Sequence, residues 1–137
     1  MKMNILKHIT ILLVAASLVG CFPASPQALR QDASARQTIE VSDGYQAVYR
    51  KVSNKLRCNE SMWIGDATRV RADLFTDIQR AEIALEGSNL LLGKRVELLI
   101  EITSTGEKST RVEVFVPFGK KVAWPVKEWI ESSSADC

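Results

Sequence analysis

Histidine is almost absent from the 137-residue chain. The one histidine, His8, lies near the N-terminus, just before an apolar run. The rest of the chain therefore has no imidazole to act as a general base, to activate a nucleophile or to bind a metal. This absence excludes most hydrolase mechanisms and leaves carboxylate or Ser/Lys chemistry open, without a sequence signature for either. We expect a protein that is not an enzyme and that binds no cofactor.

An apolar run long enough to span a membrane is also missing. The Ile9–Val19 stretch has eleven residues, well short of the roughly 20 that a bilayer core requires. It follows Lys2 and Lys7 and ends at Leu18–Cys21, with the sequence LVGC. A charged start, an apolar segment and small residues before a processing site are typical of an export signal. An uncleaved membrane helix and a secretory signal with a coincidental cysteine are the alternatives.

The Leu18–Cys21 segment resembles the lipobox of bacterial lipoproteins, in which the cysteine is acylated and becomes the first residue after cleavage. The resemblance implies a signal peptide over residues 1–20, an acyl chain such as palmitate on Cys21, and a place in the cell envelope. Phe22 stands where enterobacterial lipoproteins retained in the inner membrane carry Asp. The resemblance therefore favours the outer membrane, with the protein facing the periplasm.

Removing the signal leaves 117 residues, enough for one domain. Residues 21–37 are rich in Pro, Ala, Ser and Gln and predict a lipidated flexible tether with a reach of about 20 Å, so the domain should occupy residues 38–137. The signal contains two of the 18 basic residues, so 16 remain against 16 acidic residues. This balance gives no overall field to attract nucleic acid.

The three cysteines are Cys21, Cys58 and Cys137. With Cys21 lipidated, the other two form an even pair in an oxidising compartment, which favours a Cys58–Cys137 disulfide over two separate buried thiols. Two cysteines 79 positions apart, without a third ligand, do not predict a metal site.

The domain sequence begins with helical periodicity and continues with strand periodicity. An apolar stripe predicts a helix over 42–58, whose cations Arg50, Lys51, Lys55 and Arg57 form a solvated face or, alternatively, bind anionic lipid or glycan. Alternation predicts strands over 68–75, 79–86, 95–103 and 109–117, while 62–64 is a short edge strand or a connection. Residues 88–94 are ambiguous and could tuck Leu90–Leu92 under the domain. Pro125 predicts the start of a short helix.

This order predicts an α+β fold of two layers: an antiparallel sheet of about four strands, with a long N-terminal helix and a short C-terminal helix on one face. The pattern is loosely similar to small uncharacterised proteobacterial lipoproteins. In the 95–117 hairpin, charge pairing favours Glu101 opposite Arg111, whereas a 106–108 loop would place Glu101 opposite Glu113, and turn chemistry favours a 104–106 loop.

The leading functional interpretation is a non-enzymatic binding or assembly module of the envelope. Its candidate binding surface is the sheet face that the helices leave open, with Phe75, Leu99 and Phe115 among charged residues. One alternative is a cell-wall or glycan hydrolase that uses Glu97 and Glu101, which would share that face. Another is a structural spacer in the envelope. An envelope protein or glycan is the expected partner, besides the membrane.

Overall fold

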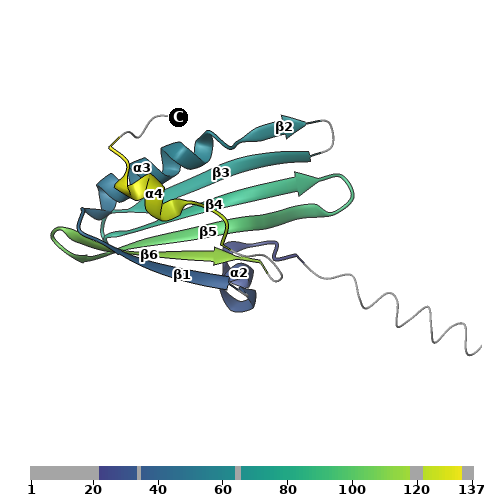
Figure 1. Ribbon diagram of the computed structural model, residues 1–137. Helices are drawn as coiled ribbons and strands as arrows, with labels where there is room; N and C mark the ends of the chain where they lie inside the picture. The colour runs from purple at the N-terminus through teal and green to yellow at the C-terminus, as the bar shows by residue number, and fades with distance from the viewer. Residues whose placement is uncertain (1–21, 34, 64–65, 118–121, 134–137) are drawn as a thin grey trace, which may run out of the picture.

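The computed structural model describes residues 22–33, 35–63, 66–117 and 122–133 and has an α+β fold. Its centre is a six-stranded antiparallel sheet in the order β1-β6-β5-β4-β3-β2 (Figure 1). The strands are β1 (Ala35–Val41), β2 (Ser61–Trp63), β3 (Asp66–Phe75), β4 (Arg80–Asn89), β5 (Gly93–Gly106) and β6 (Ser109–Val116), and the helices are α2 (Pro26–Asp32), α3 (Tyr45–Arg57) and α4 (Val126–Glu131).

Helices α3 and α4 cover one face of the sheet. The apolar stripe of α3 buries Val48, Val52 and Leu56 against inward-facing residues of the strands, as its spacing predicts. Helix α4 adds Val126 and Ile130 to this main core. Lys51 of α3 also donates a 3.0 Å hydrogen bond from Nζ to the Ile130 backbone oxygen, which ties the two helices together.

The sheet has more strands than expected, and its first long helix is shorter. The structure adds β1, which pairs along its whole length with β6. It also confirms the edge-strand alternative for 62–64, as the three-residue strand β2. Alternation in β1 places Ile39 in the main core and leaves Glu40 exposed, which is the pattern of a half-buried edge strand. The predicted helix over 42–58 begins only at Tyr45 and has thirteen residues, so it is not a long helix.

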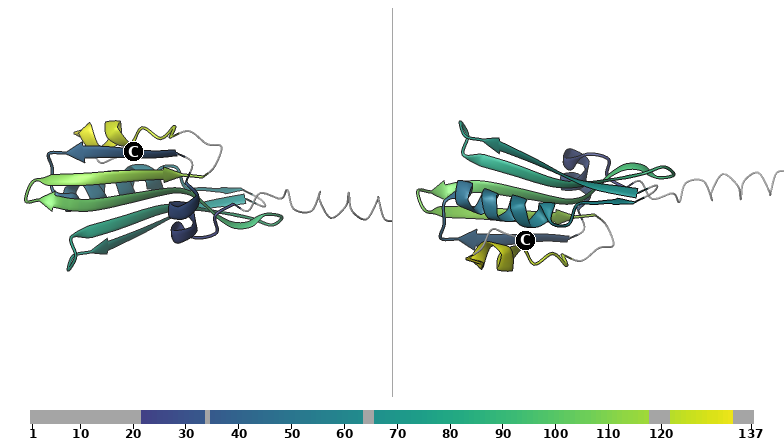
Figure 2. Two further views of the ribbon diagram at one scale, coloured as in Figure 1. Left: turned by 90° about the horizontal axis from the view of Figure 1, so that it is seen from below. Right: turned by 90° about the horizontal axis from the view of Figure 1, so that it is seen from above.

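Helix α2 lies on the face of the sheet opposite α3 and α4 (Figure 2). Ser25 caps it by accepting a hydrogen bond from the Ala28 amide, and Pro26 occupies its first turn. Leu29 is fully buried in a second, smaller apolar cluster. Residues 26–32 were expected to belong to a flexible tether, but this apolar anchor and the cap fold them into the domain.

A β-bulge in β5 reverses the faces of its first residues. Leu85 pairs with Leu98, whereas Glu86 pairs with Val96, so Glu97 is the extra residue. Val96 therefore joins the α2-side cluster, although strict alternation would place it with Leu98 in the main core.

Candidate functional site

Four carboxylates form a row across the face of the sheet that α2 covers. The strand register pairs Asp73 with Glu82, Glu82 with Glu101, and Glu101 with Glu113. Directly opposed residues in antiparallel strands have Cβ atoms roughly 5 Å apart, and like charges at that separation repel each other. This carboxylate row, Asp73, Glu82, Glu101 and Glu113, therefore needs positive charge to be stable.

Arginines supply that charge along the whole row. Nη2 of Arg71 lies 2.7 Å from Oε1 of Glu82, and Nη2 of Arg80 lies 2.8 Å from Oε1 of Glu101. Arg36 pairs with Glu113 at the β1 side of the sheet. The glutamates in the middle of the row are well covered, with 15% of the Glu82 side chain and 9% of the Glu101 side chain exposed.

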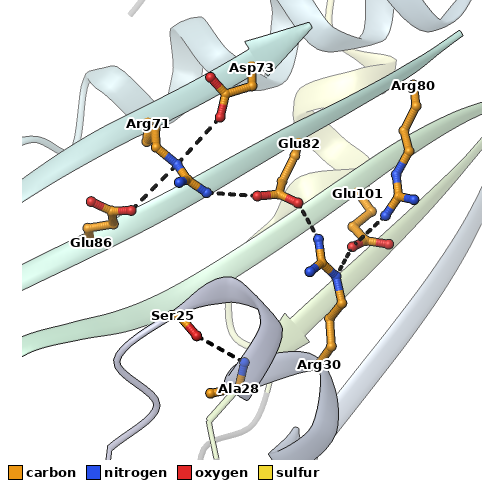
Figure 3. A network of polar contacts seen from close by, with 9 residues as sticks. All are labelled: Ser25, Ala28, Arg30, Arg71, Asp73, Arg80, Glu82, Glu86 and Glu101. Atoms are coloured by element: carbon orange, nitrogen blue, oxygen red, sulfur yellow. Dashed lines mark hydrogen bonds and ion pairs between the residues drawn. The ribbon is translucent and has the colours of Figure 1, made fainter. Parts of the chain in front are cut away.

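Arg30 of α2 crosses the middle of the row and binds two carboxylates at once. Its Nη2 donates to Glu82 and its Nε donates to Glu101 (Figure 3). Partial burial alone would lower the pKa of the Arg30 guanidinium, but the hydrogen bonds and charges of Glu101 and Glu82 raise that pKa above its usual value. Arg30 is therefore a fixed cation that joins α2 to β4 and β5.

The same contacts explain the register of the β5–β6 hairpin. Glu101 lies opposite Glu113, which is the pairing that cross-strand charge disfavoured. Arg30, Arg80 and Arg36 neutralise the two glutamates, so direct pairing with Arg111 is not required. A shift between Ser104 and Gly106 then lets the hairpin close.

The two carboxylates of the hydrolase hypothesis do not lie together. Glu97 accepts a 2.8 Å hydrogen bond from Arg95 beside Gly87, toward the α3 side of the sheet. Glu101 faces α2 on the other side, where two arginines bind it. The bulge in β5 separates the pair, because it reverses the faces at the point where Glu97 is inserted.

The structure divides the candidate binding surface. Leu99 and Phe115 are buried under α2 with Leu29, Ala84 and Val96, so they form a core cluster and no open face. Phe75 is 42% exposed near the β3–β4 turn. The turn also carries Ile78, which is 61% exposed. The prediction of one uncovered sheet face was wrong. The composition of residues 26–32 is that of a linker, so it did not predict a helix that covers this face.

A second exposed apolar group occupies the β4–β5 turn. Leu90, Leu91 and Leu92 are 89%, 94% and 60% exposed, which excludes the possibility that this ambiguous segment tucks them under the domain. The register pairs Asn89 with Gly93 and closes the hairpin directly behind them. We call these three consecutive leucines the leucine turn.

The start of the described chain lies close to this end of the sheet. The Val96 amide donates a 2.8 Å hydrogen bond to the Pro23 backbone oxygen, which attaches the first described residues to the beginning of β5. Figure 1 draws this segment and the β4–β5 turn at the same end of the sheet. The residue that the lipobox predicts to be acylated, Cys21, precedes Pro23 by two positions and lies outside the described residues.

The predicted disulfide also involves residues outside the described ranges. Cys58 follows the last turn of α3 as its C-cap. Cys137 is outside the described residues, so the Cys58–Cys137 pairing stays a prediction.

The surface has open hollows. One of about 390 Å³ lies between the start of α2 and the sheet, and its lining includes Arg69, Arg71 and Glu86. In the described parts of the chain, no group of three or more His, Cys, Asp and Glu residues could hold a metal ion. Over the same ranges, none of the helices is long and apolar enough to cross a bilayer.

Comparison with known proteins adds no relative to this picture. No protein-family model, no curated protein and no solved structure matches the chain.

Proposed function

We propose that this protein is a lipid-anchored envelope lipoprotein, acylated on Cys21, and that its domain is a non-enzymatic binding or assembly module. The Leu18–Cys21 sequence supports the anchor, and Phe22 favours the outer membrane with the domain in the periplasm. The observation that carries the proposal is the incorporation of Pro23 and α2 into the domain immediately after that cysteine. The anchor and the folded domain are thus separated by Phe22 alone.

This short connection suits a module that is presented at a fixed place on the membrane. A flexible tether of sixteen residues would let the domain rotate freely, whereas a hydrogen bond at Pro23 and the buried Leu29 hold the chain against the sheet. The proposed module therefore offers a defined membrane end, near the anchor, and a defined far end, at the β3–β4 turn.

The far end is the proposed binding surface for an envelope protein or glycan. Phe75, Leu74 and Ile78 are exposed there, and the neighbouring Arg71 and Asp73 give the surface a polar rim. Aromatic and aliphatic side chains inside a polar rim are the usual composition of a protein interface.

The separation of Glu97 from Glu101, and the arginines on Glu101, give no support to the glycan hydrolase. A glycan hydrolase needs its two catalytic carboxyl groups on either side of one glycosidic bond, which Glu97 and Glu101 could not provide from opposite sides of the sheet.

The test has two readouts. Intact mass of the wild-type protein from bacterial membranes should show a mature chain that begins at an acylated Cys21, while the Cys21→Ser form should lack lipid mass. Crosslinking in intact envelopes should then capture a stoichiometric partner that Phe75→Ser with Ile78→Ser removes. A wild-type chain without lipid would contradict the anchor. A lipidated chain that captures no stoichiometric partner would favour the structural spacer, whereas a partner whose crosslinks do not change with Phe75 and Ile78 would contradict the far end as the binding surface.

A further inference from the structure

We infer that the leucine turn, Leu90–Leu92, inserts into the surface of the membrane that holds the lipid anchor, so that the domain stands on the bilayer with its strands directed away from it. This inference rests on the proposed acylation of Cys21. It adds a second contact with the membrane and an orientation, neither of which the lipobox implies.

The first argument is the chemistry of the turn. Runs of three exposed apolar residues are rare on soluble domains unless they serve a function, because they favour association with other apolar surfaces. Leu90–Leu92 are all more than half exposed, and the flanking hairpin from Ser88 to Lys94 contains no acidic residue. Lys94, two positions after Leu92, suits the negatively charged headgroups of a bacterial membrane.

The second argument is the position of the anchor. Consecutive Cα atoms are about 3.8 Å apart, so Cys21 lies within about 8 Å of Pro23, which is bonded to Val96. Going back along β5, Gly93 lies about 10 Å from Val96, and Leu90–Leu92 immediately precede Gly93 in the chain. A lipid on Cys21 therefore places the leucine turn within reach of the same bilayer surface.

The third argument is the contrast with the other end of the sheet. Ile78 in the β3–β4 turn is as exposed as Leu92, but β3 and β4 separate it from the anchor by their full length. Apolar groups penetrate about 5 to 10 Å into the boundary between headgroups and acyl chains. Insertion at the anchored end therefore leaves Ile78 outside the membrane, which makes it a matched control.

The test places a photoreactive benzophenone residue at either position of the full-length protein in its own envelope membranes, as Leu91→p-benzoylphenylalanine or Ile78→p-benzoylphenylalanine. We expect lipid adducts at position 91 and none at position 78. Protein adducts at position 91 would overturn the inference and make the leucine turn a protein-binding surface. Equal lipid labelling at both positions would also overturn it.

A second measurement removes the anchor. The mature chain with Cys21→Ser, exported by a secretory signal, is mixed with vesicles of phosphatidylethanolamine and phosphatidylglycerol. Leu90→Ser, Leu91→Ser and Leu92→Ser together should weaken vesicle binding at least tenfold, whereas Leu74→Ser with Ile78→Ser should change it less than twofold. Circular dichroism checks that both variants fold.

The two measurements separate this inference from the proposed function. A lipidated wild-type chain with no lipid adducts at position 91 would overturn the insertion and leave the lipoprotein assignment standing. A wild-type chain without lipid, whose vesicle binding still falls tenfold on removing the leucines, would contradict the anchor and support the insertion.

Discussion

The two faces of the sheet are both covered, but different forces hold their covers. The α3–α4 face buries a continuous apolar core of sixteen residues, so its stability comes mainly from removing apolar surface from water. Among the described residues, the apolar cluster on the α2 face consists of Leu29, Ala84, Val96, Leu99 and Phe115, and beside that cluster lies the carboxylate row with its arginines. Its cover is a seven-residue helix, which would not persist alone.

This difference shows that a charged sheet face is not necessarily an open one. Alternating Glu and Arg residues along a strand usually indicate a solvated side, yet here Arg30 arrives from another element and uses the carboxylates as its binding site. Helices α3 and α4 are part of the main core. Helix α2 depends on one small apolar cluster and on Arg30, which binds two different carboxylates. We expect the α2 cover to open more easily.

The largest expected effect concerns the α3–α4 face and the predicted Cys58–Cys137 disulfide. Such a bond would close a ring of about 80 residues and stabilise the domain by up to roughly 4.5 kcal/mol in the chain-entropy model. Reduction should lower the melting temperature markedly and free the chain from Ala123 onward first. In hydrogen exchange, reduction should therefore lower the protection of the α4 amides more than that of the α2 amides. Peptide mapping that recovers both cysteines as free thiols from periplasmic protein would contradict the pairing.

The next effect compares neighbouring residues of β5 that face opposite sides. Ile100→Ala should lower the free energy of unfolding by about 3 to 4 kcal/mol, since Ile100 is fully buried in the main core. Leu99→Ala should cost about 2 to 3 kcal/mol, because the shallow α2-side cluster can relax around the lost volume. Urea unfolding of the mature chain measures both. A loss below about 0.5 kcal/mol at Leu99 would mean that α2 does not cover this face in solution.

The sequence predicted the elements whose pattern is local. Alternation over 95–103 and 109–117 was sufficient to place β5 and β6. The apolar stripe that includes Val48 and Val52 was sufficient to place α3. Ile39 and Val41 alternate as residues of a strand do, but two apolar residues are too few to predict β1. The α+β class and the antiparallel sheet therefore followed from the sequence.

The features that were missed depend on contacts between distant residues. Helix α2 has one buried apolar residue, Leu29, and its composition is that of a linker, although Ser25 followed by Pro26 was a readable helix start. The bulge at Glu97 has no local sequence mark, yet it moves Val96 to the other face. The pairing of Glu101 with Glu113 is stabilised by Arg80 and Arg36 and by Arg30, which lies 71 positions from Glu101 in the chain. Pairwise charge rules could not include that cation.

The smallest expected effect isolates that cation. Arg30→Met keeps an apolar stem over the sheet but leaves Glu82 and Glu101 facing each other with one arginine fewer. Losing the only partner of a buried ion costs about 3 to 5 kcal/mol, but Arg71 and Arg80 still bind these glutamates, so we expect a loss of about 1 to 2 kcal/mol in urea unfolding. Hydrogen exchange in α2 should rise more than in α3.

Arg36→Met is the matched control for this experiment. Arg36 also binds a carboxylate of the row, Glu113, but more than half of its side chain is exposed, so its loss should change stability by less than about 0.5 kcal/mol. Adding Glu82→Gln to Arg30→Met should recover part of the lost stability, because it removes one of the two facing charges. Equal losses for the two arginine variants, with no recovery by Glu82→Gln, would show that α2 is held by Leu29 alone and that the carboxylate row is only a solvated surface.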